Sequence, residues 1–207
     1  MYLPPHFAEH RVEVLHDALR EAGLFTVVTH LGGLDAEHLP LLLEPTPAPL
    51  GRLVGHVARG NPLWSRLGAG APALAVAVGP DAYVTPSWYP SKRETGRVVP
   101  TWNYVTVHAH GTLRAFDDRE RLRDVVGRLT ERHERGRPAP WTVADAPADY
   151  LEDMLAGIVG VELTIERLEG KWKTSQNRTE ADRRGVAEGL DAAGERELAS
   201  HVLRHGG

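Results

Sequence analysis

Apolar residues near the start of the chain recur first with a helical period and then with a strand period. A helix over 7–22 is predicted by five apolar residues at intervals of four and three: Ala8, Val12, Leu15, Leu19 and Ala22. A strand over 24–30 follows, because that stretch is short, β-branched and aromatic. Gly32-Gly33 predicts a hairpin turn into a returning strand over 34–43, and Pro40 places that strand at an edge or bulge.

The middle of the chain alternates short strands with turn residues. A strand is predicted over 52–58, and Asn61-Pro62 begins a short helix, because asparagine caps helices and proline is tolerated in the first turn. Two further strands are predicted over 73–78 and 83–88, joined by a turn at Gly79-Pro80-Asp81. A long loop over 89–101 follows.

A strict alternation then marks a strand over 103–116, with Val105, Val107 and Ala109 on one face and His108 and His110 on the other. Asp117-Asp118 caps a helix, a second helix covers 148–156, and a last strand covers 158–168. From residue 180 the chain reads as a polar helical tail.

These elements amount to about seven strands that come mostly as consecutive hairpins, with helices before, between and after them. This order favours a mainly β, α+β fold: an antiparallel barrel or sandwich with helices packed outside.

The amino-acid composition of the chain excludes or disfavours several classes of function. With 207 residues, one large domain or a domain with an appendage is expected. The absence of cysteine excludes disulfides, iron–sulfur clusters and a cysteine nucleophile. The net charge of −4 argues against a strongly basic DNA-binding surface. The sequence shows neither a signal peptide nor an apolar run long enough for a membrane helix, so we expect a cytoplasmic protein.

One part of the chain carries more aromatic and polar residues than folding requires. YVTPSWYPSK (83–92) and VPTWNY (99–104) place Trp88, Tyr89 and Trp102 beside Ser91, Lys92 and Asn103. Aromatic planes next to hydroxyls and a lysine suit a flat ring that bears a phosphate. A buried aromatic cluster with polar caps is the structural alternative.

Two further segments offer anion-binding groups. In EGKWKTSQNR (169–178), Lys171 and Lys173 share one face of an extended chain, and Gln176 and Asn177 add neutral donors. A solvated strand end explains the same residues. In GHVARGN (55–61), His56 ends a strand, and Asn61 lies at a helix cap where backbone N–H groups suit anions.

His108 and His110, two apart on one strand face, have a spacing that zinc accepts. A polar outer strand face explains them better, and we assign no metal site. The sequence contains no GxSxG, P-loop, HExxH or strand-linked GxGxxG motif.

Taken together, the segments resemble a known family, the FMN-binding negative transcriptional regulators of the PaiB type. The resemblance covers Met1 to about Leu190 and rests on six ordered blocks: MYLPPHF, HLPLLL, GHVARGNPLW, GPDAYVTPSWYPSK, VVPTWNYVTVH and GKWKTSQNR. Thr85 and Gly60 are small departures from the family pattern. We therefore expect a domain over 1–190 and a helical tail over 191–207.

The resemblance implies a split antiparallel β-barrel related to pyridoxamine 5′-phosphate oxidase, FMN as cofactor, and a homodimer with the flavin at the subunit interface. It also implies that Ser91 and Lys92 hold the phosphate, with Lys171, Gln176 and Asn177 close by. The same resemblance places the flavin ring near His56, Trp88 and Trp102.

The sequence is compatible with three classes of function. The first is an FMN-binding regulatory protein that acts indirectly, because no DNA-reading element is visible. The second is a flavin-dependent oxidoreductase on a small substrate, for which His56 and Tyr89 are the candidate proton donors. A haem-handling split barrel is a third and weaker class, which the eleven histidines allow.

Overall fold

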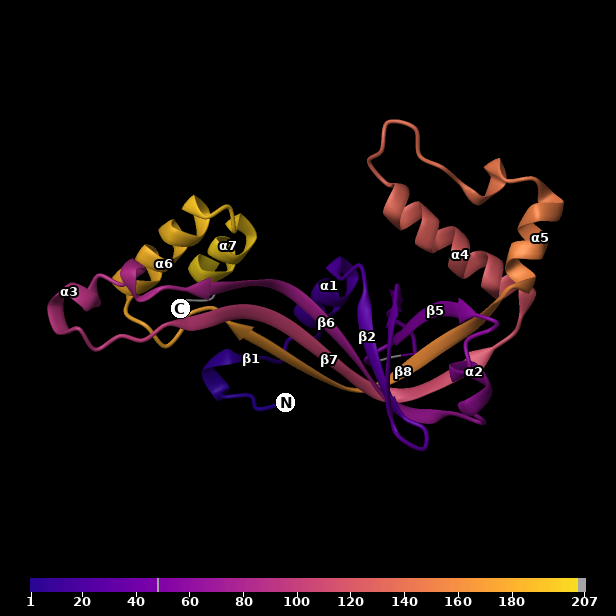
Figure 1. Cartoon of the computed structure of the whole chain (residues 1–207), viewed down its shortest axis with the longest axis horizontal. Coiled ribbons are helices and arrows are strands. Elements are labelled where there is room, and N and C mark those ends of the chain that lie inside the picture. The colour runs from indigo at the N-terminus through magenta and orange to yellow at the C-terminus, as the bar shows by residue number, and fades with distance from the viewer. Residues whose placement is uncertain (48, 205–207) are drawn as a thin grey trace. The chain divides into compact units, whose positions relative to one another are not determined.

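The computed structural model describes residues 1–47 and 49–204, and within these ranges the chain forms eight strands with flanking helices (Figure 1). The strands are β1 (Ala8–Glu9), β2 (Phe25–His30), β3 (Leu34–Leu39), β4 (Leu42–Glu44), β5 (Arg52–Ala58), β6 (Ala71–Val84), β7 (Thr101–Phe116) and β8 (Ile158–Lys173). The α-helices are α1 (Val12–Glu21), α2 (Leu63–Arg66), α3 (Ser91–Thr95), α4 (Arg119–Glu134), α5 (Ala148–Ala156), α6 (Glu180–Ala192) and α7 (Arg196–Arg204). Three short 3₁₀ turns are η1 (Pro5–Phe7), η2 (Pro86–Trp88) and η3 (Val143–Asp145).

All eight strands belong to one sheet, in the order β3-β2-β6-β7-β8-β5-β4, with β1 paired to β8. The pairings whose register is resolved are antiparallel. β2 and β3 form the hairpin that Gly32-Gly33 predicts, with His30 opposite Leu34. The structure therefore confirms an antiparallel sheet built largely from hairpins.

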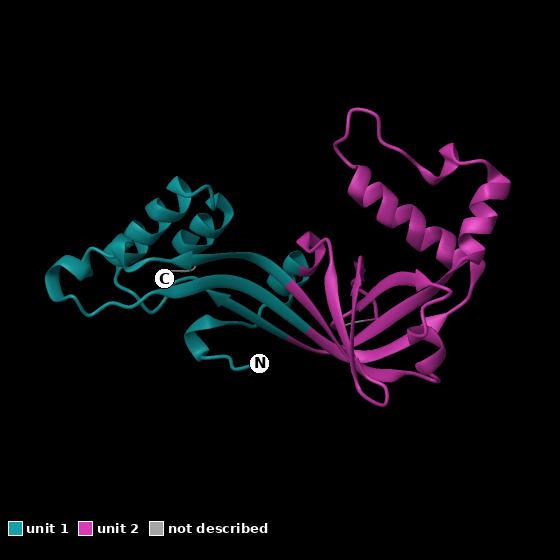
Figure 2. Cartoon of the chain, in the orientation of Figure 1, with its two compact units in different colours: residues 1–18, 78–108, 169–207 teal, residues 19–77, 109–168 magenta. Residues whose placement is uncertain are grey.

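The chain divides into two compact units (Figure 2). Unit 1 contains residues 1–18, 78–108 and 169–207, and unit 2 contains residues 19–77 and 109–168. Helices α6 and α7 both belong to unit 1. The division into a domain over 1–190 and a helical tail over 191–207 stays a prediction.

The alternation in β7 is confirmed in full. Every second residue from Asn103 to Leu113 is buried, and the residues between them are half-buried. Gly111 fits this pattern because a Cβ there would lie 1.9 Å from the backbone oxygen of Thr164 on β8. The helices after Asp118 and over 148–156 are confirmed as α4 and α5. Asp118 caps α4 by accepting a hydrogen bond from the backbone N–H of Arg121 at 2.7 Å.

The turn predicted at Gly79-Pro80-Asp81 is wrong, because β6 runs unbroken through these residues. A Cβ on Gly79 would lie 3.2 Å from the Cβ of Val105 on β7. The glycine therefore permits a close approach of two strands rather than a change of direction. The strand predicted over 83–88 also ends early, since Pro86–Trp88 forms η2.

The predicted helix over 7–22 begins later than expected, at Val12. The carboxylate of Glu9 accepts the backbone N–H groups of His10 and Arg11, both at 2.9 Å, so it satisfies donors ahead of the helix. Ala8 pairs with Lys171 as part of β1. The predicted strand over 34–43 is likewise two strands, β3 and β4, interrupted at Pro40, as the missing N–H of proline requires.

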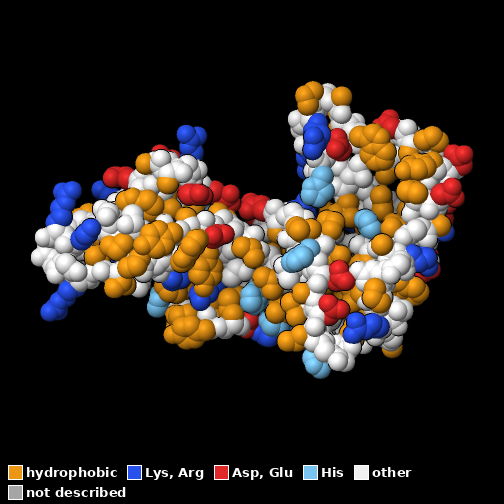
Figure 3. All heavy atoms as spheres, in the orientation of Figure 1, with side chains coloured by type: hydrophobic (Ala, Val, Ile, Leu, Met, Phe, Trp, Pro, Cys, Tyr) orange, Lys and Arg blue, Asp and Glu red, His pale blue; other side chains and the backbone are white. Residues whose placement is uncertain are grey.

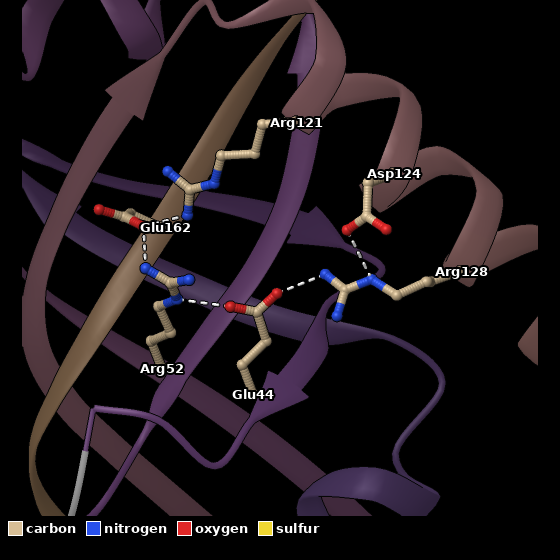
Figure 4. Close-up of polar contacts among 6 residues, drawn as sticks. All are labelled: Glu44, Arg52, Arg121, Asp124, Arg128 and Glu162. Atoms are coloured by element: carbon tan, nitrogen blue, oxygen red, sulfur yellow. Dashed lines mark hydrogen bonds and ion pairs between the residues drawn. The ribbon is translucent and has the colours of Figure 1, made fainter.

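A network of charged side chains fixes α4 to the sheet within unit 2 (Figure 4). Glu44 accepts hydrogen bonds from Arg52 at 2.5 Å and from Arg128, and Glu162 accepts hydrogen bonds from Arg52 and Arg121. We call the six residues drawn in Figure 4 the Glu44–Glu162 network: Glu44, Arg52, Arg121, Asp124, Arg128 and Glu162.

Within unit 1, α6 and α7 pack on each other and on the end of β6. The buried residues of this cluster include Val84, Tyr89, Leu190 and Leu198, so α6 and α7 each contribute a leucine to the core of unit 1. None of the helices in residues 1–47 and 49–204 combines the length and apolarity needed to cross a membrane.

Candidate functional site

Three of the segments singled out in the sequence meet within unit 1. The ammonium of Lys173 on β8 donates to Thr101 Oγ1 on β7 at 2.6 Å, and Asn103 donates to Ser175 Oγ at 2.9 Å. The guanidinium carbon of Arg178 lies 4.9 Å from the ring centroid of Tyr89. Segments 88–92, 101–104 and 171–178 therefore form one neighbourhood.

A small cavity of about 110 Å³ lies at this meeting point. We call it the Lys173 pocket, and its lining residues are Phe7, Thr101, Asn103, Lys173, Ser175, Asn177 and Arg178. Its volume equals roughly three to four waters at about 30 Å³ each, so it admits a phosphate-sized group but no flavin ring. Its described lining contains two cations and several neutral donors but no carboxylate.

The turn after β8 shapes one wall of this pocket. Ser175 has a φ of 67°, a left-handed conformation that is uncommon outside glycine, and it is 4% exposed. The side chain of Gln176 holds the turn, because its amide donates to the carbonyl of Trp172 at 2.5 Å and accepts from the N–H of Thr174 at 2.8 Å. The nitrogen and the oxygen of the Gln176 side-chain amide therefore both form hydrogen bonds with the backbone.

The cations of this site face aromatic rings and hydroxyls instead of acids. The ammonium groups of Lys171 and Lys173 lie 5.4 and 5.8 Å from the ring centroid of Tyr104. This confirms that the two lysines share a face of the strand. Burial lowers the pKa of Lys173, and the positive charges of Lys171 and Arg178 lower it further against an opposing effect of Tyr104. A bound anion would stabilise the charged form of the Lys173 amine.

The predicted phosphate ligands Ser91 and Lys92 lie at the start of α3. The Ser91 hydroxyl donates to Asp182 at 2.8 Å, and its backbone N–H donates to the same carboxylate at 3.1 Å. Lys92 is exposed, and its ammonium donates to Ser87 Oγ at 3.3 Å. The long loop predicted over 89–101 therefore contains a short helix anchored to α6, a feature that the sequence analysis missed.

The predicted ring-binding aromatics have different surroundings. Trp88 packs against α6, since a Cβ on Gly189 would lie 2.3 Å from its ring. Tyr89 is 2% exposed, and burial raises its pKa, so it is a core residue of unit 1. Trp102 is 53% exposed and lies edge-to-face on Tyr83 with centroids 6.2 Å apart.

His56 and Asn61 belong to unit 2. His56 on β5 is half-buried, burial lowers its pKa, and its Nδ1 has no hydrogen-bond partner among the described residues. Asn61 accepts the N–H of Leu63 at 2.8 Å and donates to Glu37 at 2.8 Å. The helix start predicted at Asn61-Pro62 is confirmed.

Residues 1–167 match the profile of FMN_bind_2, a family described as "Putative FMN-binding domain". The chain belongs to this family. A curated relative, "Protease synthase and sporulation protein PAI 2" of Bacillus subtilis, is 35% identical over 191 residues, which cover 92% of this chain and 89% of the relative.

Solved structures share the fold of this FMN_bind_2 chain. The FAD and heme binding protein from Mycobacterium smegmatis has a TM-score of 0.59 at 24% identity, with coverage of 80% of this chain and 73% of that one. The flavocytochrome Anf3 from Azotobacter vinelandii has a TM-score of 0.58 at 15% identity, with coverage of 84% and 70%. The predicted split β-barrel and the predicted FMN cofactor are both confirmed.

The residues of the Lys173 pocket fit the phosphate end of the family's cofactor. Lys173 and Arg178 supply charge, Thr101 and Ser175 supply hydroxyls, and Asn103 supplies an amide. Lys173, Thr101, Ser175 and Arg178 were not among the predicted ligands. The alternation of Lys171 and Lys173 was the signal that could have found Lys173, because it already placed both cations on one face.

Proposed function

We propose that this chain is an FMN-binding regulatory protein that holds the flavin phosphate in the Lys173 pocket. The observation that supports this proposal is a half-buried cation, Lys173, whose hydrogen-bond partner is a hydroxyl and whose pocket has no described carboxylate. The flavin supplies redox chemistry when bound. The chain's own residues bind its phosphate and orient it.

The charge balance of the pocket favours a phosphate monoester. Such a group carries about −1.5 to −2 charges at neutral pH. Lys173 and Arg178 compensate that charge, and the donors of Asn103, Ser175 and Thr101 fix the direction of the phosphate oxygens. We keep the assignment of Ser91 and Lys92 as a second proposed phosphate contact, in which Lys92 reaches the outer oxygens.

Titration of FMN and riboflavin tests this proposal, because riboflavin lacks the phosphate. Lys173→Met should weaken FMN binding about 10- to 100-fold, since a hydrogen bond to a charged group contributes roughly 1.5–3 kcal/mol. Riboflavin binding should change less than about twofold. Lys92→Ala should show the same selective loss, but a smaller one, because Lys92 is exposed.

Arg93→Met is the matched control, because it removes an exposed charge from α3 next to Lys92. It should leave both affinities unchanged. Equal FMN affinity in wild type and Lys173→Met would remove Lys173 from the site. An equal loss of FMN and riboflavin affinity would mean that the substitution disturbs the fold rather than a phosphate contact.

We propose that the chain is a homodimer whose interface includes the strand segments 52–58 and 83–88. The exposed side chain of Tyr83, and that of Trp102 packed on it, support an interface at segment 83–88. Light scattering of the flavin-loaded protein should give twice the chain mass of 22.7 kDa. The mass of a single chain would contradict the dimer.

The regulatory effect that we propose is indirect. The net charge is −4, and on the face shown in Figure 3 acidic and basic side chains both occur over each unit. Specific DNA complexes usually reach about 10⁻⁸ M or tighter at physiological salt. In a mobility-shift assay the purified protein should not shift a promoter fragment at nanomolar concentration over competitor DNA, and a specific shift would overturn this proposal.

A flavin-dependent oxidoreductase is the second candidate, and His56 is the observation that favours it. His56 is half-buried, burial lowers its pKa, and its Nδ1 has no hydrogen-bond partner among the described residues, so the ring is available for proton transfer with a substrate. Reduction of the bound flavin by NADPH, followed by absorbance and slowed by His56→Gln, would support this candidate. Wild-type protein that NADPH does not reduce would argue against it.

A further inference from the structure

Helices α6 and α7 enclose a cleft that the flavin proposal does not use. The cleft has two cavities, of about 550 and 200 Å³, and Arg184 and Leu203 line both of them. The larger cavity lies in the size range of small-molecule sites. Both cavities belong to unit 1, where the two helices lie side by side (Figure 1).

Arg183 is the unusual residue of this cleft. It lines the smaller cavity, its Nε is buried, and its guanidinium has no hydrogen bond or ion pair with any residue of the described chain. The neighbouring arginines are paired, since Arg184 lies 2.5 Å from Glu180 and Arg196 lies 3.6 Å from Asp191. A buried guanidinium donor without an acceptor is costly, so a missing anionic partner is the simplest explanation.

The rest of the cleft is suited to an apolar body. Ala187 and Ala199 line the larger cavity and are 5% and 6% exposed, and Val202 lines the smaller one. Leu203 is 62% exposed although it lies between the two cavities. Covering this leucine would remove apolar surface from water.

We infer that the α6–α7 cleft binds a small amphipathic organic anion, with its acidic group on Arg183 and its apolar body along Leu203 and Ala199. The inference does not depend on where the flavin phosphate lies. Each cavity has a glutamate in its lining, but Glu180 of the smaller cavity is paired with Arg184, whereas Glu188 of the larger cavity has no ion pair among the described residues. The uncompensated charge of Glu188 opposes an anion in the larger cavity, which favours placing the acidic group in the smaller one. Such a site would let a metabolite of this chemical class regulate the protein through α6.

Two matched probes test this inference. 1-Anilinonaphthalene-8-sulfonate carries a sulfonate on an aromatic body, and N-phenyl-1-naphthylamine has the same body without the charge. Equilibrium dialysis against the FMN-saturated wild-type protein should show one site for the anion. Arg183→Met should weaken the anion about tenfold or more and leave the neutral probe within about twofold.

Three further variants locate the site. Leu203→Ser should weaken both probes several-fold, because it removes the shared apolar contact without opening the core. Glu188→Gln should strengthen the anion two- to threefold, since it removes a like charge. Arg204→Met, which removes an exposed arginine of α7 that lines neither cavity, is the control and should change the anion's affinity less than about twofold.

The inference is overturned if Arg183→Met leaves the affinity of the sulfonate unchanged. It is also overturned if Arg183→Met and Arg204→Met weaken the sulfonate equally, because binding would then reflect general surface charge. Circular dichroism of each variant, unchanged from wild type, establishes that α6 and α7 remain folded. A failure here leaves the FMN affinity of the Lys173 pocket unaffected, so the two proposals fail separately.

Discussion

The Lys173 pocket in unit 1 and the Glu44–Glu162 network in unit 2 are both rich in cations, but they use them differently. In the network, three arginines face three carboxylates, and Glu44 and Glu162 each accept from two of the arginines (Figure 4). In the pocket, Lys173 and Arg178 face hydroxyls, amides and rings.

This difference separates a structural cluster from a binding site. Burial raises the pKa of Glu44, but the hydrogen bonds from Arg128 and Arg52 outweigh it, so the pKa ends below its usual value. The arginines and carboxylates of the network therefore compensate one another's charge. The pocket leaves positive charge uncompensated, which costs stability in the free protein and is recovered when an anion binds.

The largest expected effect comes from breaking the network. Glu44→Gln with Glu162→Gln should lower the free energy of unfolding by about 2–3 kcal/mol, less than for a fully buried pair because the arginines are partly exposed. Urea denaturation measures the loss. FMN affinity should stay within about twofold, and a large loss of FMN affinity would mean that the network also serves binding.

Removing the cation of the Lys173 pocket should change the free energy of unfolding in the opposite direction. We expect Lys173→Met to raise the free energy of unfolding by roughly 0.5–1 kcal/mol in the absence of FMN, because it removes a desolvated charge with no acid beside it. Urea denaturation of both proteins without flavin checks this. A variant less stable than wild type by more than about 1 kcal/mol would place Lys173 among the structural residues.

The smallest expected effect is a pH dependence of flavin selectivity. Because the pKa of Lys173 is lowered by burial, its amine loses its proton at a lower pH than an ordinary lysine does. FMN affinity relative to riboflavin should therefore fall several-fold as the pH rises from 7 toward 10. The same ratio measured in Lys173→Met should be flat over this range, and a parallel fall in both proteins would assign the titration to another group.

Much of the fold could be predicted because local signals agree with tertiary packing. The alternation in β7 has the period of a strand buried on one face, and Asp118 caps α4 through a contact within one turn. The errors occurred where a local signal had a non-local cause. Gly79 resembles a turn glycine in sequence, but Val105 on the neighbouring strand determines its role.

The site could be predicted as segments but not as contacts. The sequence indicated the three segments that meet in unit 1, because aromatic, hydroxyl and basic residues gather there. It could not show that Asp182, 91 positions away along the chain, accepts the Ser91 hydroxyl, or that Thr101 lies opposite Lys173. Such pairings depend on strand register and helix docking, which local sequence does not specify.

A crystal structure of the FMN complex tests the central claim most directly. We predict a phosphate oxygen within about 3 Å of the Lys173 ammonium, with Arg178 and the Ser175 hydroxyl as further partners. Lys92 would lie at the outer side of the same phosphate. A phosphate bound away from Lys173, with the Lys173 pocket filled only by water, would contradict the account.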